Sequence, residues 1–204
     1  MLVTSGRFIL ASASPRRFEL LSLLGLRFEV MPSHVDEAFA QGEKPREHVL
    51  RLSEEKTRTA AALHPDAWVM GADTIVIING EVLGKPRSPG EAKEMLGKLS
   101  GHVHTVFTGF TVVRRSADIC VKDAVESSVR FREIPDDEMA WYIRSKEPYD
   151  KAGGYAVQGM GAFFIKEIQG SYTNVMGLPL CEVVDMLKGI GAIDFTGENH
   201  GVNG

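Results

Sequence analysis

The sequence predicts an α/β protein, because strand-like and helix-like segments alternate along the chain. Runs rich in β-branched and aromatic residues are separated by stretches whose apolar residues recur at helical spacing. The Asn79-Gly80 pair between two apolar runs is typical of a β-hairpin. With 204 residues and 44% hydrophobic content, the chain can bury a core as one domain or two small lobes. We place this domain at 1–195 and expect the polar, glycine-rich stretch 196–204 to be a disordered tail.

The first half of the chain begins with a strand that leads directly into a helix. Ser14 is a good N-cap, Pro15 suits the first helical position, and Gly25 ends the apolar periodicity. The Asn79-Gly80 turn joins a long apolar strand to a short one. In chain order we expect a strand over 7–11, the helix from Pro15, a strand over 28–31, a helix over 45–63, and strands over 67–78 and 81–83.

The second half of the chain continues the alternation. Ser88 precedes an apolar-periodic segment that the Ser100-Gly101 pair ends, which predicts a capped helix. A segment starting at Pro135 has three acidic residues in its first turn, the arrangement that the helix dipole favours. We expect a helix over 89–99, two paired strands over 102–114 and 121–133, a helix over 135–146, strands over 155–157 and 162–168 around a glycine-rich bend, and a last helix over 180–187.

Composition and charge exclude several classes of protein. The formal net charge of −4 argues against a general nucleic-acid binder, whose domain is usually basic. Cys120 and Cys181 form no CxxC pair, so the sequence indicates neither a zinc site nor a disulfide framework, and we expect both thiols to be buried. No stretch has a secretory pattern or approaches the ~20 apolar residues of a membrane span. We therefore expect a soluble cytoplasmic protein.

Several familiar catalytic motifs are absent from the sequence. It contains no GxxxxGK[ST] phosphate loop, no HExxH, no GxSxG and no GxGxxG between a strand and a helix. The six histidines share no metal-ligand spacing, and we expect His102 and His104 to lie at the surface of their strand. A Ser/His/Asp or Cys/His hydrolase is therefore not indicated.

The first feature that points to chemistry is a pair of arginines in the first turn of the predicted helix. This turn carries partial positive charge and favours acidic residues, so Arg16 and Arg17 are unfavourably placed there. A bound anion would offset the cost, because free N–H groups and two guanidiniums together suit a phosphate. From this segment alone, two solvated surface arginines are an equally good interpretation.

Further charged residues stand at the ends of predicted elements. Asp73 interrupts an apolar stretch, where a carboxylate is costly unless it binds a metal, a hydrogen-bond donor or a reacting water; a turn-capping role is the alternative. The predicted hairpin would bring Lys85 close to Asp73. Asp36 and Glu37 offer oxygen ligands for Mg²⁺, although such residues are often solvated loop acids. Lys56 lies on the long predicted helix, where an exposed lysine is the plain alternative.

A third polar segment covers 147–159. Its glycines would let the backbone approach a ligand closely, and Glu147, Asp150 and Lys151 add polar groups that a plain turn does not need. The amide of Gln158 carries both a donor and an acceptor. It could therefore satisfy two groups on the edge of a uracil or thymine base.

Together, four motifs resemble the Maf family of nucleoside triphosphate pyrophosphatases. They are Ser12-Ala-Ser-Pro-Arg-Arg17, Gly71-Ala-Asp-Thr74, Gly84-Lys-Pro86 and Asp150-Lys-Ala-Gly153 with Tyr155 and Gln158-Gly159, in the family's order between about 8 and 187. More narrowly, they are similar to the branch that acts on dTTP and UTP. The sibling branch, acting on 7-methyl-GTP, typically has glutamate where this chain has Gln158, and a carboxylate suits the donors of guanine.

The resemblance implies an elongated mixed β-sheet flanked by helices, with a substrate cleft between two lobes. It also implies hydrolysis of dTTP or UTP, and of modified pyrimidine nucleotides such as 5-methyl-UTP, to the monophosphate and pyrophosphate. A divalent cation, Mg²⁺ or Mn²⁺, and a homodimer are expected, and no nucleic-acid or membrane partner. The implied roles are catalysis by Asp73; substrate specificity by Arg16, Thr74 and Gln158; phosphate binding by Ser12, Ser14, Arg17, Lys56 and Lys85; and metal binding by Glu37 and Asp73.

Two functional hypotheses follow from the resemblance. The first is an enzyme that removes non-standard or excess pyrimidine nucleotides. The second is a nucleotide-binding regulator of septum formation with little catalysis, since the family is also associated with inhibition of septation. A pure sensor has no need of Asp73 beside Lys85 and two arginines, so we favour the enzyme.

Overall fold

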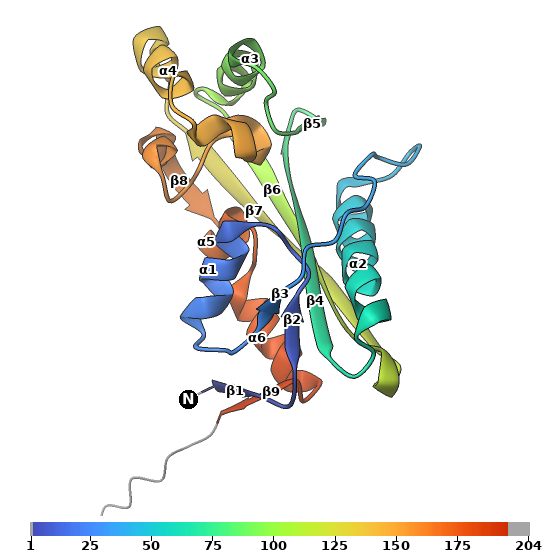
Figure 1. Ribbon diagram of the computed structural model, residues 1–204. Coiled ribbons are helices and arrows are strands. Elements are labelled where there is room, and N and C mark those ends of the chain that lie inside the picture. Colours follow the sequence, from blue (N-terminus) through green and yellow to red (C-terminus); the bar gives the residue numbers. More distant parts are fainter. Residues whose placement is uncertain (1, 196–204) are drawn as a thin grey trace, which may run out of the picture.

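A seven-stranded mixed β-sheet forms the centre of the molecule in the computed structural model, which describes residues 2–195 (Figure 1). The strand order is β3-β2-β4-β6-β7-β8, and β5 pairs with β4 outside this path. β2 is parallel to β3 and β4, whereas the other pairs in this sheet are antiparallel. The strands are β1 (Leu2–Thr4), β2 (Phe8–Leu10), β3 (Glu29–Val30), β4 (Trp68–Ile78), β5 (Glu81–Leu83), β6 (Val103–Arg114), β7 (Ile119–Phe131), β8 (Ile165–Gln169) and β9 (Ile193–Phe195). The predicted α/β class is confirmed.

Helices flank this sheet along its length (Figure 1). They are α1 (Pro15–Leu23), α2 (Pro45–Leu63), α3 (Pro89–Leu99), α4 (Asp136–Ile143), α5 (Tyr172–Met176) and α6 (Leu180–Gly189). Short 3₁₀ turns cover Glu147–Asp150, Ala152–Gly154 and Met160–Phe164.

The long strands β4, β6 and β7 run through two lobes, each with its own hydrophobic core. In one lobe, α1 and α6 cover the sheet with Leu20, Leu21, Val183 and Leu187. In the other lobe, α3 and α4 pack against the far ends of the same strands (Figure 1). β4 places Met70 in the first core and Val76 in the second. The segment of β4 between these residues therefore lies at the junction of the lobes.

Helix α2 packs closely on the opposite face of the sheet because two strand glycines allow it to. A Cβ on Gly71 would lie 2.5 Å from Thr57 Oγ1, and one on Gly109 would overlap the backbone carbonyl of Val49. Buried hydroxyls add polar contacts at the same interface, where Ser53 Oγ lies 2.8 Å from Thr111 Oγ1. These contacts fix the distance of α2 from β4 and β6.

Most predicted elements are confirmed, several of them to the residue. The helices over 45–63 and 89–99 have the predicted bounds, Ser88 accepts a hydrogen bond from the Glu91 N–H at 3.2 Å, and the hairpin forms at Asn79-Gly80. The predicted strand over 155–157 is wrong, and 3₁₀ structure replaces the start of the strand predicted over 162–168. The β1–β9 pair and α5 were not predicted.

Two further expectations about single residues are wrong. Both Cys120 and Cys181 are exposed, not buried. Conversely, His104 is only 1% exposed, because its side of β6 packs against Phe131 and Tyr155, whereas His102 is exposed as expected. The predicted disordered tail at 196–204 lies outside the described residues.

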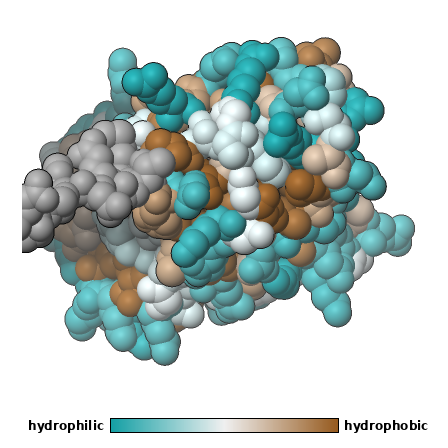
Figure 2. Space-filling view, turned by 90° about the horizontal axis from the view of Figure 1, so that it is seen from below, coloured by the Kyte–Doolittle hydropathy of each residue, from teal (hydrophilic) through white to brown (hydrophobic). Residues whose placement is uncertain are grey.

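Among residues 2–195, no helix is long and apolar enough to cross a membrane. Figure 2 shows a mostly hydrophilic surface on the face that it views, interrupted by small hydrophobic areas. Single exposed apolar residues of this kind are common on folded domains.

Candidate active site

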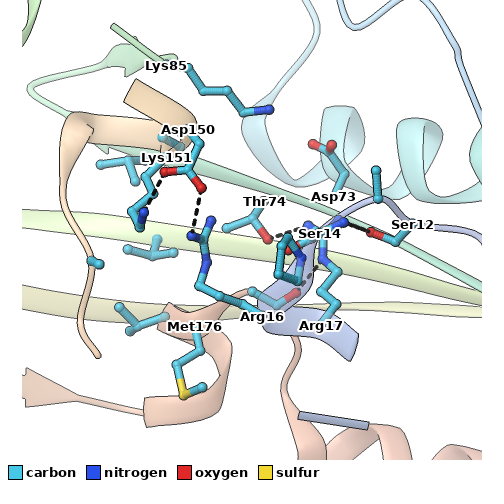
Figure 3. Close-up of a pocket in the computed structure, with 18 of the residues that line it drawn as sticks. Ser12, Ser14, Arg16, Arg17, Asp73, Thr74, Lys85, Asp150, Lys151 and Met176 are labelled. Atoms are coloured by element: carbon cyan, nitrogen blue, oxygen red, sulfur yellow. Dashed lines mark hydrogen bonds and ion pairs between the residues drawn. The ribbon is translucent and has the colours of Figure 1, made fainter. Parts of the chain in front are cut away.

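A cleft with a volume of about 430 Å³ opens at the junction of the two lobes. Such a volume lies within the range of small-molecule sites. The first lobe contributes the loop from β2 and the start of α1, and the second contributes Lys85 and the segment around Lys151 (Figure 3). The cleft is lined by nine of the ten residues predicted for the site, namely Ser12, Ser14, Arg16, Arg17, Glu37, Lys56, Asp73, Thr74 and Lys85.

Asp73 lies at the midpoint of β4 and is 7% exposed. Its Oδ1 accepts a hydrogen bond from the Lys56 ammonium at 2.7 Å, and the same ammonium donates to Glu37 Oε1 at 2.6 Å. Lys56 is itself buried, at 8% exposure, so it is neither an exposed lysine nor an isolated buried charge. One cation thus holds two carboxylates that the sequence places far apart.

The electrostatics of Glu37 reflect this arrangement. Burial raises the pKa of Glu37, but the hydrogen bond from Lys56 and the charges of Lys56, Lys85 and Arg17 outweigh burial and lower the pKa below its ordinary value. Glu37 therefore stays ionised at neutral pH. Its neighbour Asp36 has a local role, since its Oδ1 accepts a hydrogen bond from the Ala38 N–H at 3.0 Å.

Arg17 is held across the floor of the cleft by neutral acceptors. It donates to the Gly177 carbonyl at 2.8 Å, to Thr74 Oγ1 at 2.9 Å and to Ser12 Oγ at 3.2 Å (Figure 3). Burial lowers the pKa of Arg17, and the nearby charge of Asp73 partly reverses this shift. A guanidinium whose hydrogen bonds go to uncharged groups keeps its full charge for an anion in the cleft.

The start of α1 presents the anion-binding geometry that the sequence indicates. Ser14 has extended backbone at the N-cap position, but its side chain makes no capping hydrogen bond, and the first turn contains no acidic residue. The Ser14 N–H donates instead to Ser12 Oγ at 3.2 Å. The first turn of α1 therefore presents to the cleft the partial positive charge of a helix N-terminus together with two arginines.

Charged pairs join the two lobes across the mouth of the cleft. Arg16, on α1, lies 3.6 Å from Asp150 Oδ2 in the opposite lobe, and Asp150 also pairs with Lys151 (Figure 3). Burial raises the pKa of Asp150, but Lys151 and Arg16 outweigh it and lower the pKa. Arg16, which is half-buried, is thus a bridging residue rather than a solvated one.

Gln158 is the one predicted site residue that does not line the cleft. Its side chain is exposed, whereas Val157, one position earlier, belongs to the cleft wall. Gly153 and Gly154, with φ of +71° and +70°, turn the chain before it, and the Gly153 N–H donates to the Gly84 carbonyl at 3.0 Å. The loop that carries Gln158 therefore stands at the rim of the cleft.

A family model described as Maf-like protein matches residues 7–190 of the chain. The chain belongs to the Maf family. A dTTP/UTP pyrophosphatase from Syntrophus aciditrophicus is 61% identical over 194 residues, which are 95% of each chain. Another from Geotalea uraniireducens is 48% identical over 194 residues, which are 95% of this chain and all of the relative.

The fold is also similar to that of the Staphylococcus aureus Ham1 protein. The TM-score is 0.51 with 12% sequence identity, and the match covers 91% of this chain and 100% of the other. At this identity the similarity concerns the fold alone.

A buried aromatic pair behind the Maf cleft was not predicted. Tyr155 lines the cleft, and its hydroxyl lies 2.7 Å from His104 Nε2. Phe131 packs edge-on against both rings, with centroid distances of 5.0 Å to His104 and 4.8 Å to Tyr155. Burial lowers the pKa of His104 to about 4.

His104 should make the stability of the fold depend on pH. Its pKa is about 4 when folded and 6.5 in the unfolded reference, so between these values the unfolded chain binds more protons. The free energy of unfolding should therefore fall as the pH is lowered from 6.5 towards 4, and His104 alone should account for about 2–3 kcal/mol of that fall.

Urea unfolding at pH 7 and pH 4.5 would measure this contribution. The His104→Gln variant, which keeps a polar partner for Tyr155 but cannot titrate, should lose less stability over this interval than the wild type. Equal losses in the two proteins would contradict the assignment.

Proposed function

We propose that this Maf-family protein hydrolyses dTTP and UTP between the α and β phosphates, releasing the nucleoside monophosphate and pyrophosphate. The observation that carries the proposal is a buried carboxylate, Asp73, in a cleft whose other polar groups are mostly cationic or hydroxyl donors. The names of close relatives, dTTP/UTP pyrophosphatases, support the substrates and favour the enzyme over the regulatory hypothesis.

In the proposed reaction, Asp73 orients a water molecule and removes its proton as the oxygen attacks the α-phosphorus. The hydrogen bond from Lys56 goes to Oδ1, so we assign the proton transfer to Oδ2. The bond between the α-phosphorus and the bridging oxygen breaks, and pyrophosphate leaves. General-base assistance of this kind contributes about 10²- to 10⁴-fold to a rate.

The cationic side chains stabilise the charge that shifts onto the leaving pyrophosphate. Arg17 is preorganised by its three neutral acceptors, so it need not rearrange as the charge develops. Lys85 lines the same cleft from the opposite lobe (Figure 3). Ser12 and Ser14 add hydroxyls, and the ammonium of Lys56, with three donors, has one left after its two carboxylate bonds.

Glu37 and Asp73 fit a divalent cation together with a substrate. Their oxygens converge on one ammonium at 2.6 and 2.7 Å, and Mg²⁺ commonly takes one or two carboxylates plus substrate phosphates. Within the described part of the chain, no cluster of three or more His, Cys, Asp or Glu residues could hold a metal by itself. We therefore propose that Glu37 and Asp73 would hold Mg²⁺ or Mn²⁺ only together with a bound nucleotide, and that the ion would neutralise charge on the triphosphate.

The predicted base-recognition residues are part of the same proposal. Thr74 lies beside Arg17 on the cleft floor, Arg16 lies at the mouth, and Gln158 is at the rim. From the rim, the Gln158 amide could reach the edge of a pyrimidine. The homodimer, the cytoplasmic location and the absence of a nucleic-acid partner stay predictions.

Product analysis of UTP incubated with the protein would test the reaction. With Mg²⁺ present, ion-exchange separation should detect UMP and pyrophosphate in equal amounts, and EDTA should abolish both. UDP and inorganic phosphate as the products would contradict cleavage between the α and β phosphates.

A further inference from the structure

We propose that Glu147 is a positioning residue that fixes the loop carrying Gln158 and thereby sets the selectivity of the cleft for its base. The inference rests on the proposed function, because it assumes that Gln158 contacts the base of a nucleotide. It concerns a residue that lies outside the cleft lining and that no step of the proposed chemistry uses.

The carboxylate of Glu147 joins two separate parts of the chain. Its Oε1 accepts hydrogen bonds from the Tyr142 hydroxyl on α4 at 2.9 Å and from the Gly161 N–H at 2.8 Å. Its Oε2 accepts from the Met160 N–H at 2.8 Å. Burial and the Glu147 carboxylate raise the pKa of Tyr142, so its hydroxyl remains a donor at any physiological pH. The backbone amides of Met160 and Gly161, which follow Gln158 after Gly159, are thus tied to helix α4 through one side chain.

Two glycines make this close approach possible. A Cβ on Gly159 would overlap the carboxylate of Glu147, and one on Gly161 would lie 2.8 Å from the Tyr142 hydroxyl. Gly159 has φ of −120°, so the absence of a side chain, rather than an unusual backbone conformation, is what the position requires. The segment after Gln158 is therefore shaped around the Glu147 carboxylate.

Glu147 and the amides that it binds form an anchor for the loop, and this anchor is connected to residues that line the cleft. The backbone carbonyl of Glu147 accepts a hydrogen bond from the Lys151 ammonium at 3.0 Å, and Lys151 lines the cleft. On the other side, Val157 belongs to the cleft wall. Gln158 thus lies between a residue of the wall and two amides held by Glu147.

The position of this loop should matter more for selectivity than for catalysis. The edge of uracil presents an N–H donor beside a carbonyl acceptor, whereas cytosine presents an acceptor beside an amino donor. An amide side chain distinguishes the two only if its place at the rim is fixed, because a mobile one can turn to satisfy either base. Asp73 and Arg17 lie on other elements and do not depend on this anchor.

The experiment compares the full-length wild type with Glu147→Gln, Tyr142→Phe and a matched control, Glu167→Gln. Glu167 lies on β8 with its side chain 63% exposed and pairs only with Arg130 among the ion pairs described. The first readout is the ratio of kcat/KM for UTP to that for CTP. The second is the ratio of dissociation constants for the α,β-methylene analogues of both nucleotides, which needs no turnover. The third is amide hydrogen exchange at Met160 and Gly161.

In Glu147→Gln, the amide nitrogen replaces one acceptor oxygen, so at least one of the anchoring bonds is lost. We expect both selectivity ratios to fall about tenfold in Glu147→Gln and about threefold in Tyr142→Phe, within the roughly 100-fold loss that a misplacement of about 1 Å can cause. Exchange at Met160 and Gly161 should become faster in both variants. The control should match the wild type in all three readouts. If Glu147→Gln does not fold, Tyr142→Phe, which removes a single hydroxyl, carries the test.

Faster exchange with unchanged selectivity ratios would show that the anchor is structural only, and would overturn the proposal. An equal fall of kcat/KM for both nucleotides, or wild-type exchange at both amides, would also overturn it. If the wild type releases no pyrophosphate, the proposed function fails, and the ratio of dissociation constants still decides the role of Glu147.

Discussion

Asp73→Asn is expected to reduce pyrophosphate release from UTP by about 10²- to 10⁴-fold, the usual contribution of a general base. Asparagine is nearly isosteric and can still accept the hydrogen bond that Lys56 donates to Oδ1. It cannot take a proton from water, so kcat should fall far more than nucleotide affinity. The fold should survive, which circular dichroism and urea unfolding would verify.

A matched control for this substitution is Asp123→Asn. Asp123 lies on β7, away from the cleft, and its half-exposed side chain pairs with Arg46 at 2.8 Å. Its replacement should leave kcat and KM at wild-type values. If Asp73→Asn turned over UTP within about threefold of the wild-type rate, far less than a general base contributes, the proposed mechanism would be wrong.

Gly109→Ala is expected to have the largest effect on stability. The new methyl group would overlap the carbonyl group of Val49, and that neighbour is backbone of helix α2, which cannot turn aside as a side chain can. Overpacking of this kind costs about 1–3 kcal/mol and sometimes more. Because α2 also carries Lys56 to Asp73, displacement of the helix should lower kcat as well.

Gly97→Ala is the control for the stability change that replacing glycine by alanine causes in the absence of a steric clash. Gly97 lies inside helix α3, and a Cβ there would meet no atom within 4 Å. Alanine should therefore stabilise the protein by about 0.5–1 kcal/mol, because it restricts the unfolded chain and favours the helix. Urea unfolding would measure both variants. Equal stability of Gly109→Ala and the wild type would mean that α2 does not need its close approach to the sheet.

Elements determined by local sequence were predicted well. Pro45 at the start of α2 and Ser88 before α3 are short-range signals, and the Asn79-Gly80 turn specifies its hairpin without help from the rest of the chain. The β1–β9 pair was missed because its partners come from opposite ends of the chain and each strand has only three residues.

Elements determined by tertiary contacts were predicted poorly. The segment after Gly154 has strand-like residues at 155–157, but the preceding turn, with its hydrogen bond from Gly153 to the Gly84 carbonyl, leaves it no strand to pair with. His104 lies on the buried side of β6 because Phe131 and Tyr155, from later parts of the chain, pack against it, and alternation along the sequence cannot show such contacts.

In the site, too, the functional residue types could be predicted from the sequence, whereas their contacts with each other could not. Arginines at a helix start and a carboxylate within an apolar strand could be recognised from the sequence, because each is costly without a ligand or a partner. That the partner of Asp73 is Lys56, and that the same ammonium holds Glu37, depends on how α2 crosses β4. Neither distance along the chain nor residue type indicates that contact.

The most direct test of the proposed function is pyrophosphate release by the wild type with Mg²⁺ from dTTP, UTP, CTP, GTP and 7-methyl-GTP. We predict the highest kcat/KM for dTTP and UTP. Preference for 7-methyl-GTP would keep the reaction but contradict the proposed base recognition. Binding of these nucleotides without release of pyrophosphate from any of them would contradict the proposed activity itself.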